Sequence, residues 1–141
     1  MRVIDASVAL AWQFERADRS EASLAARVLA DLPDTGAAVP AIWHLELANS
    51  MLRGERTGLC TSAQTVFFFD KLMRTNIETD ETAAESTVAS TVLLARRHSL
   101  TAYDAAYLEL ALRLGLELAT FDKRLAVAAR AAGVRVVGDG V

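Results

Sequence analysis

Short apolar runs alternate with longer amphipathic stretches along this chain. The runs of strand length are Val3–Ile4, Ala37–Val39, Asn76–Glu78, Leu116–Thr120 and Val134–Val137. Apolar residues recur at helical spacing in Val8–Phe14, Glu21–Leu32, Ile42–Arg53, Thr61–Met73, Asp80–Arg97, Ala102–Leu114 and Lys123–Ala132. Strands separated by helices predict a parallel sheet covered on both faces. We therefore expect an α/β protein, a three-layer α/β/α sandwich with short strands and a mainly parallel central sheet.

Proline and glycine residues suggest where several of these helices end. We expect the second helix to stop before Pro33 and the third to end near Gly54 or Gly58. Gly115 and Gly133 are expected to close two later helices. Since no repeat, low-complexity tract or linker interrupts the pattern, residues 1–141 are expected to form one domain.

Composition narrows the class of protein further. The 141 residues are 52% hydrophobic and 23% charged, which is typical of a globular protein. No apolar run reaches the ~20 residues of a membrane span, and Asp5 interrupts the start where a secretory signal would continue. We expect a cytoplasmic protein without a membrane segment. The single cysteine, Cys60, excludes an internal disulfide and a cysteine metal cluster.

The formal net charge of −3 argues against a protein that holds nucleic acid by bulk electrostatic attraction. It leaves open a nuclease whose acidic site is neutralised by a metal ion. Nucleotide cofactors are not expected, because the chain has no glycine-rich phosphate loop. The two histidines, His44 and His98, are too far apart in sequence to form a ligand motif, and no serine nucleophile elbow is present.

Four acidic residues stand out by their position relative to the expected strands. Asp5 and Asp122 lie at or just past the carboxyl ends of strands, whereas Glu46 and Asp104 lie on helices that can reach the same edge. Ligands of such sheets bind beyond the carboxyl ends of the strands. Together these residues predict a ligand site at this edge of the sheet.

Each acid taken alone has a simpler explanation. Asp5 and Asp122 could cap helices, and Asp104 stands three residues after Thr101, the spacing of a capping box. Glu46 could belong to a solvent-exposed polar stripe on its helix. The ligand site is therefore a hypothesis about the four residues jointly.

Four segments resemble a known family. They are Val3–Val8 (VIDASV), Pro40–Asn49 (PAIWHLELAN), Leu100–Ala111 (LTAYDAAYLELA) and Leu118–Leu125 (LATFDKRL). In this order they resemble the PIN-domain ribonucleases, and within them the VapC toxins of bacterial toxin–antitoxin pairs. The resemblance covers almost the whole chain, and its third segment is the most specific.

The resemblance implies a function and a set of site residues. The acids that match the family's metal-binding and catalytic positions are Asp5, Glu46, Asp104 and Asp122. The polar residues that match positions bordering the site are Ser7, Asn49 and Thr120. The expected activity is endonucleolytic cleavage of RNA, transfer or ribosomal, by metal-activated water. The expected cofactor is Mg²⁺, with Mn²⁺ as a substitute, and the expected assembly is a homodimer that binds a VapB-like antitoxin.

Two other functions fit parts of the sequence. A PIN-fold protein could act mainly as the regulatory partner of an antitoxin, with little or no nuclease activity. Alternatively, Asp5 could be the phosphorylated nucleophile of a phosphoryl-transfer protein. That second alternative lacks a partner acid beside Asp5, and Lys71 and Lys123 are the only lysines available to it.

Overall fold

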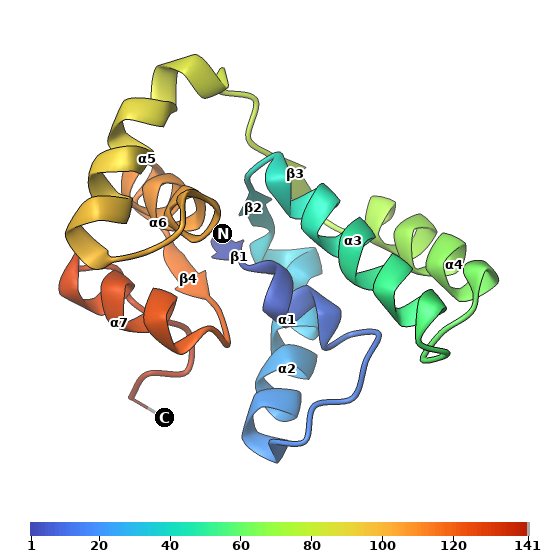
Figure 1. The fold of residues 1–141 in the computed structure, drawn as a ribbon. Coiled ribbons are helices and arrows are strands. Elements are labelled where there is room, and N and C mark those ends of the chain that lie inside the picture. The colour runs from blue at the N-terminus through green and yellow to red at the C-terminus, as the bar shows by residue number, and fades with distance from the viewer. Residues whose placement is uncertain (141) are drawn as a thin grey trace.

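All four strands in the described part of the chain belong to one parallel sheet (Figure 1). The structure is a computed structural model that describes residues 1–140. The strands are β1 (Arg2–Ile4), β2 (Ala37–Val39), β3 (Ile77–Thr79) and β4 (Glu117–Ala119). Their order across the sheet is β3-β2-β1-β4, and Val3 lies level with Ala38 on one side and Leu118 on the other.

Seven helices connect these strands within residues 1–140. They are α1 (Ala6–Leu10), α2 (Arg19–Thr35), α3 (Ile42–Arg56), α4 (Ser62–Met73), α5 (Ala84–His98), α6 (Ala102–Leu114) and α7 (Lys123–Ala131). Among the described residues, none of these helices is both long and apolar enough to cross a membrane.

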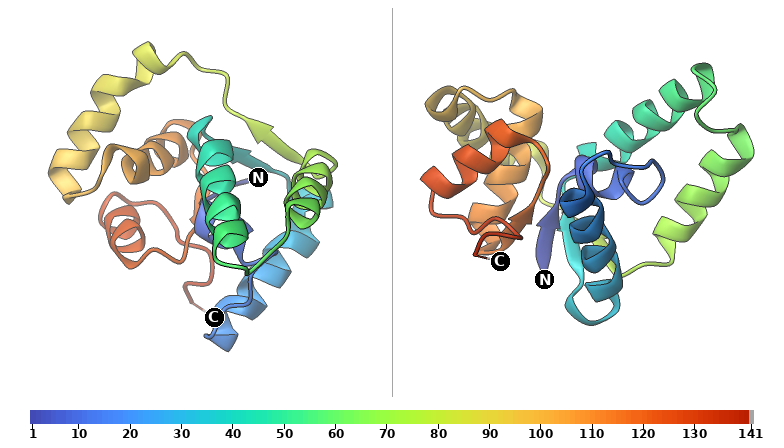
Figure 2. Two further views of the ribbon diagram at one scale, coloured as in Figure 1. Left: turned by 45° about the vertical axis from the view of Figure 1, so that its right-hand side comes forward. Right: turned by 90° about the horizontal axis from the view of Figure 1, so that it is seen from below.

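The order of the strands determines on which face each helix packs. From β1 the chain moves to β2 and then β3 in one direction, and it returns past β1 to form β4 on the far side. Because crossovers between parallel strands are right-handed, this reversal sends the later helices to the opposite face. Figure 2 shows α1–α4 on one side of the strands and α5–α7 on the other. The expected three-layer α/β/α fold is confirmed.

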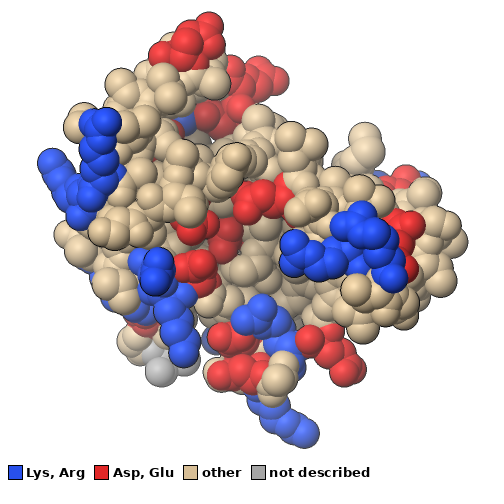
Figure 3. All heavy atoms as spheres, in the orientation of Figure 1, with Lys and Arg blue, Asp and Glu red and all other residues tan. Residues whose placement is uncertain are grey.

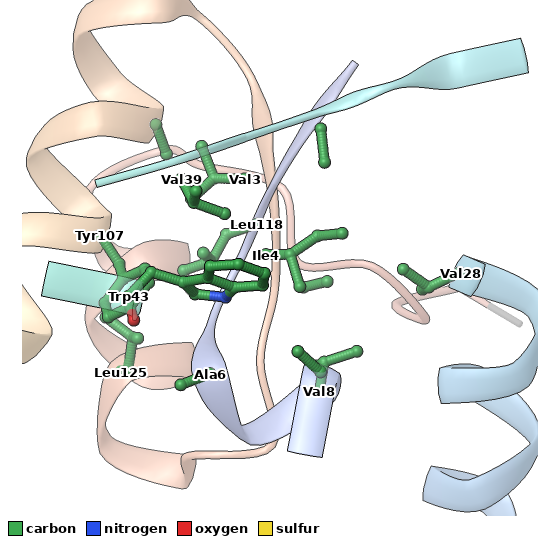
Figure 4. Packing of buried hydrophobic residues seen from close by; sticks show 14 of the residues in the cluster. Val3, Ile4, Ala6, Val8, Val28, Val39, Trp43, Tyr107, Leu118 and Leu125 are labelled. Atoms are coloured by element: carbon green, nitrogen blue, oxygen red, sulfur yellow. The ribbon is translucent and has the colours of Figure 1, made fainter. Parts of the chain in front are cut away.

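The core is centred on β1, whose Val3 and Ile4 are fully buried. Trp43 of α3 and Tyr107 of α6 are the largest side chains with almost no exposed surface, and Leu118 of β4 packs in the same cluster (Figure 4). The sheet therefore lies between helices that supply large apolar side chains to both faces.

Two helices start or end differently from the sequence prediction. α2 continues through Pro33 to Thr35, because the missing N–H of the proline affects only the last turn, where Gly36 N–H donates to the Leu32 carbonyl at 2.9 Å. α5 begins at Ala84 and not near Asp80, because the Asp80 carboxylate pairs with Arg113 at 2.6 Å and stays in the connection after β3.

Other boundaries differ because tertiary contacts override local signals. α1 ends at Leu10, before the expected end at Phe14, and turns follow it. The expected last strand, Val134–Val137, is wrong, since this segment makes only an isolated bridge between Val136 and Leu118.

Gly54 shows why α3 does not stop at its first glycine. It is buried inside the helix, and a Cβ atom there would lie 2.9 Å from Phe14 Cζ and 3.0 Å from Cys60 Sγ. The residues after α1 thus approach the backbone of α3 closely, and α3 is the helix that carries Glu46.

Replacing Gly54 by alanine should destabilise the protein, although alanine favours helices by about 1 kcal/mol. We expect Gly54→Ala to lower the free energy of unfolding by roughly 1–3 kcal/mol through overpacking. Urea unfolding of this variant and of the double variant with Cys60→Ala, which removes one close contact, would check this. A single variant as stable as the parent would contradict the close approach.

Candidate active site

The carboxyl ends of β1 and β4 open onto an acidic pocket. It is lined by Asp5, Ala6, Ser7, Leu10, Arg16, Glu46, Ser50, Asp104, Phe121 and Asp122. The order in which strands are added to the sheet reverses between β1 and β4. Open α/β sheets form their ligand sites at such a point. All four acids singled out in the sequence line this pocket, and Figure 3 shows acidic side chains gathered in the middle of this face.

Asp5 is the buried member of the group, with 5% of its surface exposed. It follows β1 directly and occupies the N-cap position of α1, yet its side chain makes no capping hydrogen bond. Instead its Oδ2 accepts hydrogen bonds from Ser7 Oγ at 2.7 Å and Thr120 Oγ1 at 2.8 Å. Among residues 1–140 no hydrogen bond uses Oδ1, which leaves that oxygen available to a ligand.

The two hydroxyls that hold Asp5 also connect β1 to the loop after β4. Ser7 Oγ accepts from the backbone N–H of Phe121, and Thr120 Oγ1 accepts from that of Asp122, each at 3.0 Å. The hydroxyls therefore fix the carboxylate and the loop at the same time.

Glu46 is oriented by a residue that the sequence analysis did not single out. The hydroxyl of Tyr107, whose side chain is fully buried in α6, donates to Glu46 Oε1 at 2.7 Å. The signal was present in the spacing, because Tyr107 stands three residues after Asp104 and so shares its helix face. What the spacing could not show is that this face meets α3.

Asp104 and Asp122 lie at helix starts, as their alternative explanations required. The backbone N–H of Asp104 donates to Thr101 Oγ1, so its carboxylate is not needed for the cap. Asp122 does act as a cap, since its Oδ1 accepts from Leu125 N–H at 2.9 Å. Asp122 thus serves α7 with one oxygen and faces the pocket with the rest of its carboxylate.

Burial and mutual repulsion favour the neutral forms of three of these acids. Burial, with additional repulsion from Asp104 and Asp122, raises the pKa of Asp5 despite its two hydrogen bonds. Burial also raises the pKa of Glu46 and of Asp104, and neighbouring carboxylates add to both shifts. Ionising all of these carboxylates at once is therefore unfavourable in the pocket.

The donor set fits a hard divalent cation, although the acids do not form a closed cluster. Within residues 1–140, no three acidic, histidine or cysteine side chains stand close enough to hold a metal ion as they are placed. The oxygen-only chemistry of the four acids and the available Oδ1 of Asp5 match the ligands of Mg²⁺ or Mn²⁺.

The expected border residues divide into two groups. Ser7 and Thr120 support Asp5, whereas Asn49 is exposed and is absent from the pocket lining, where Ser50 takes part. Neither Lys71 nor Lys123 lines the pocket, so the phosphoryl-transfer alternative finds no lysine at Asp5.

Solved structures with a similar fold include the following three. PAE2754 from Pyrobaculum aerophilum superposes with a TM-score of 0.69 and 21% identity over 96% of this chain and 88% of that chain. A toxin–antitoxin complex from Klebsiella pneumoniae superposes with a TM-score of 0.63 and 18% identity over 89% of this chain and 90% of that chain. FitAcB from Neisseria gonorrhoeae superposes with a TM-score of 0.61 and 19% identity over 96% of both chains.

Sequence comparison adds the family. Curated proteins gave no significant match. A family model for the PIN domain matches residues 2–131, which includes all four acids, the strands that place them and the helices on both faces. This chain therefore belongs to the PIN domain family.

Proposed function

We propose that this protein is a metal-dependent endoribonuclease and the toxin of a VapBC-type toxin–antitoxin pair. The observation that carries the proposal is the convergence of Asp5, Glu46, Asp104 and Asp122, from four separate segments, on one pocket. PIN domains are generally metal-dependent nucleases. A protein that served only as a binding partner would gain no stability from gathering these charges.

The proposed roles of the acids follow from their contacts. Asp5 and Asp104 would hold the cation, since neither carboxylate is used to cap its own helix. Asp122 would contribute less directly, because Oδ1 is engaged with Leu125 N–H. A bound Mg²⁺ or Mn²⁺ would supply an activated water and would neutralise charge that develops on the phosphate.

Glu46 is placed to handle a proton. Tyr107 occupies Oε1 by donating to it, which leaves Oε2 to orient a water molecule. Since burial raises the pKa of Glu46, its carboxylate is a stronger proton acceptor than an exposed one. Burial together with the adjacent Asp5 also raises the pKa of Tyr107, so Tyr107 stays protonated and acts only as a donor.

An antitoxin partner is supported by similarity and by the surface. One of the similar structures is a toxin–antitoxin complex. On this chain α3 and α4 expose apolar side chains to solvent, namely Leu45, Leu52, Val66 and Phe67. Of the three adjacent phenylalanines, Phe68 is buried, Phe69 is half-buried and Phe67 is 63% exposed. Such a face suits a small partner that binds through apolar contacts.

The proposed homodimer would use a different surface. No residue of α5 is buried, and α5 and α6 expose Val88, Leu93, Leu112 and Leu114. A second copy of the chain would cover these side chains on the face opposite to α3 and α4, so dimerisation and antitoxin binding would not compete.

Removing the acids should abolish cleavage without unfolding the protein. We expect Asp5→Asn and Asp104→Asn each to reduce the rate of RNA cleavage by at least ~100-fold, because each would remove a ligand of the metal ion. Asp34→Asn, at an exposed acid outside the pocket, is the matched control and should cleave normally. Chelation of divalent metal should stop the parent protein. Near-parental rates in both pocket variants would favour the regulatory-partner alternative.

Metal and pH should affect stability through the same carboxylates. Folding raises the pKa values of Asp5, Glu46 and Asp104, so the metal-free protein loses stability as pH rises from the ordinary carboxyl pKa of ~4 through these raised values. At pH 7, Asp5→Asn should therefore raise the melting temperature of the metal-free protein, and the gain should vanish near pH 4. The substitution should keep the hydrogen bonds of Asp5, because Ser7 and Thr120 both donate to Oδ2 and the carbonyl oxygen of asparagine can accept both.

Added metal should raise the melting temperature of the parent more than that of Asp5→Asn. Mg²⁺ at ten times its Kd adds about 1.4 kcal/mol to the parent, which is roughly 3–5 °C in melting temperature for a domain of this size. Asp5→Asn should respond far less, and Asp34→Asn should respond like the parent. An unchanged melting curve of the parent in millimolar Mg²⁺ and Mn²⁺ would count against a metal site.

Tyr107 should act by positioning Glu46. Tyr107→Phe removes the hydroxyl and keeps the buried ring, so the loss of one hydrogen bond to a charged group should lower kcat about 10–100-fold. KM and the response of the melting temperature to Mg²⁺ should change little. A fall in kcat together with a shift of the acidic limb of the pH profile to higher pH, because the Tyr107 hydroxyl no longer lowers the pKa of Glu46, would support this role. An unchanged kcat would refute it.

A further inference from the structure

Arg16 is the only basic side chain among the described residues that line the acidic pocket. It belongs to the connection between α1 and α2, which the sequence pattern did not connect with the site. The other lining residues are acidic, apolar or hydroxyl-bearing.

The guanidinium of Arg16 is held on two sides. Its Nε donates to Glu21 Oε2 at 2.8 Å, and its Nη2 donates to the same oxygen. Its Cζ lies 4.7 Å from the centre of the Phe121 ring, which is within the range of a cation–π contact. Phe121 stands between Thr120 and Asp122, so the arginine rests on the loop that also borders the carboxylates.

These contacts leave part of the group free to bind a ligand. Among residues 1–140 no hydrogen bond involves Nη1, and the side chain keeps 34% of its surface exposed. Since Glu21 and Phe121 already fix the guanidinium plane, binding through Nη1 would cost little additional side-chain order. A planar donor held in this way matches the geometry of a phosphate oxygen.

The acidic lining of the pocket would repel RNA, and Arg16 can offset this repulsion by binding a phosphate. A polyanionic strand entering the pocket meets several carboxylates, and phosphate contacts are what fix the position of a nucleic acid on a protein. We propose that Arg16 binds a backbone phosphate next to the bond that is cleaved and so positions the RNA strand. This inference rests on the proposed ribonuclease function and adds a substrate-binding residue to it.

The test compares Arg16→Gln with Arg19→Gln, which removes the same charge from an exposed site at the start of α2. With purified RNA that the parent cleaves, Arg16→Gln should raise KM about tenfold with a smaller change in kcat, and Arg19→Gln should behave as the parent. Arg16→Lys should restore KM only partly, because a point charge cannot use the planar fork.

Two further measurements separate phosphate binding from support of the fold. In an Asp104→Asn background, which prevents cleavage, the salt dependence of binding to the same RNA should lose about 0.7 from its slope in Arg16→Gln. Glu21→Gln breaks the ion pair but keeps the arginine, so its slope should match the parent. If Glu21→Gln reproduces every effect of Arg16→Gln, the arginine is only structural and the inference is wrong.

The outcomes also distinguish this inference from the proposed function. If the parent cleaves RNA and Arg16→Gln shows the KM and salt slope of Arg19→Gln, the phosphate contact is overturned and the ribonuclease stands. If the parent neither binds nor cleaves transfer or ribosomal RNA with Mg²⁺ or Mn²⁺ present, the ribonuclease proposal fails and the role of Arg16 falls with it.

Discussion

The site depends on the order of the strands, which are added on one side of β1 as far as β3 and then on its other side as β4. Because β1 lies between β2 and β4, and because right-handed crossovers send helices to opposite faces on its two sides, the loops after β1 and β4 separate and leave an opening. Asp5 stands at the first of these loops and Asp122 at the second. Ser7 and Thr120 span the opening by donating to one oxygen of Asp5. The strand order therefore creates the pocket, and two hydroxyls keep its walls in register.

Burying Asp5 beside other acids opposes folding, and the structure limits this cost in two ways. Its hydrogen bonds stabilise the charged carboxylate, although burial still raises its pKa. The other acids stay half-exposed, Glu46 and Asp104 on helices and Asp122 just before one, and water screens their repulsion. The same arrangement suits a cation: one carboxylate is held rigidly, and the others lie on side chains that can approach it. Gathering these carboxylates therefore costs stability unless a cation neutralises them.

Contacts between helices and their connections position the other residues around the pocket. α3 and α6 meet through the hydrogen bond from Tyr107 to Glu46, which joins helices on opposite faces of the sheet above the site. The connection between α1 and α2 brings Arg16 against Phe121, so that within residues 1–140 one basic side chain lines the pocket. The exposed apolar side chains of α3–α4 and α5–α6 lie outside the lining of the pocket.

The sequence by itself determined the local features. Periodicity predicted all seven helices and the four strands, since each depends on neighbouring residues, and the positions of Asp5 and Asp122 after strands predicted the acidic edge. Only the tertiary structure decided that Tyr107 orients Glu46, that Arg16 joins the pocket lining, and that Val134–Val137 forms no strand. These features depend on contacts between segments far apart in the chain. Spacing along one helix shows which residues share a face, but not what that face meets.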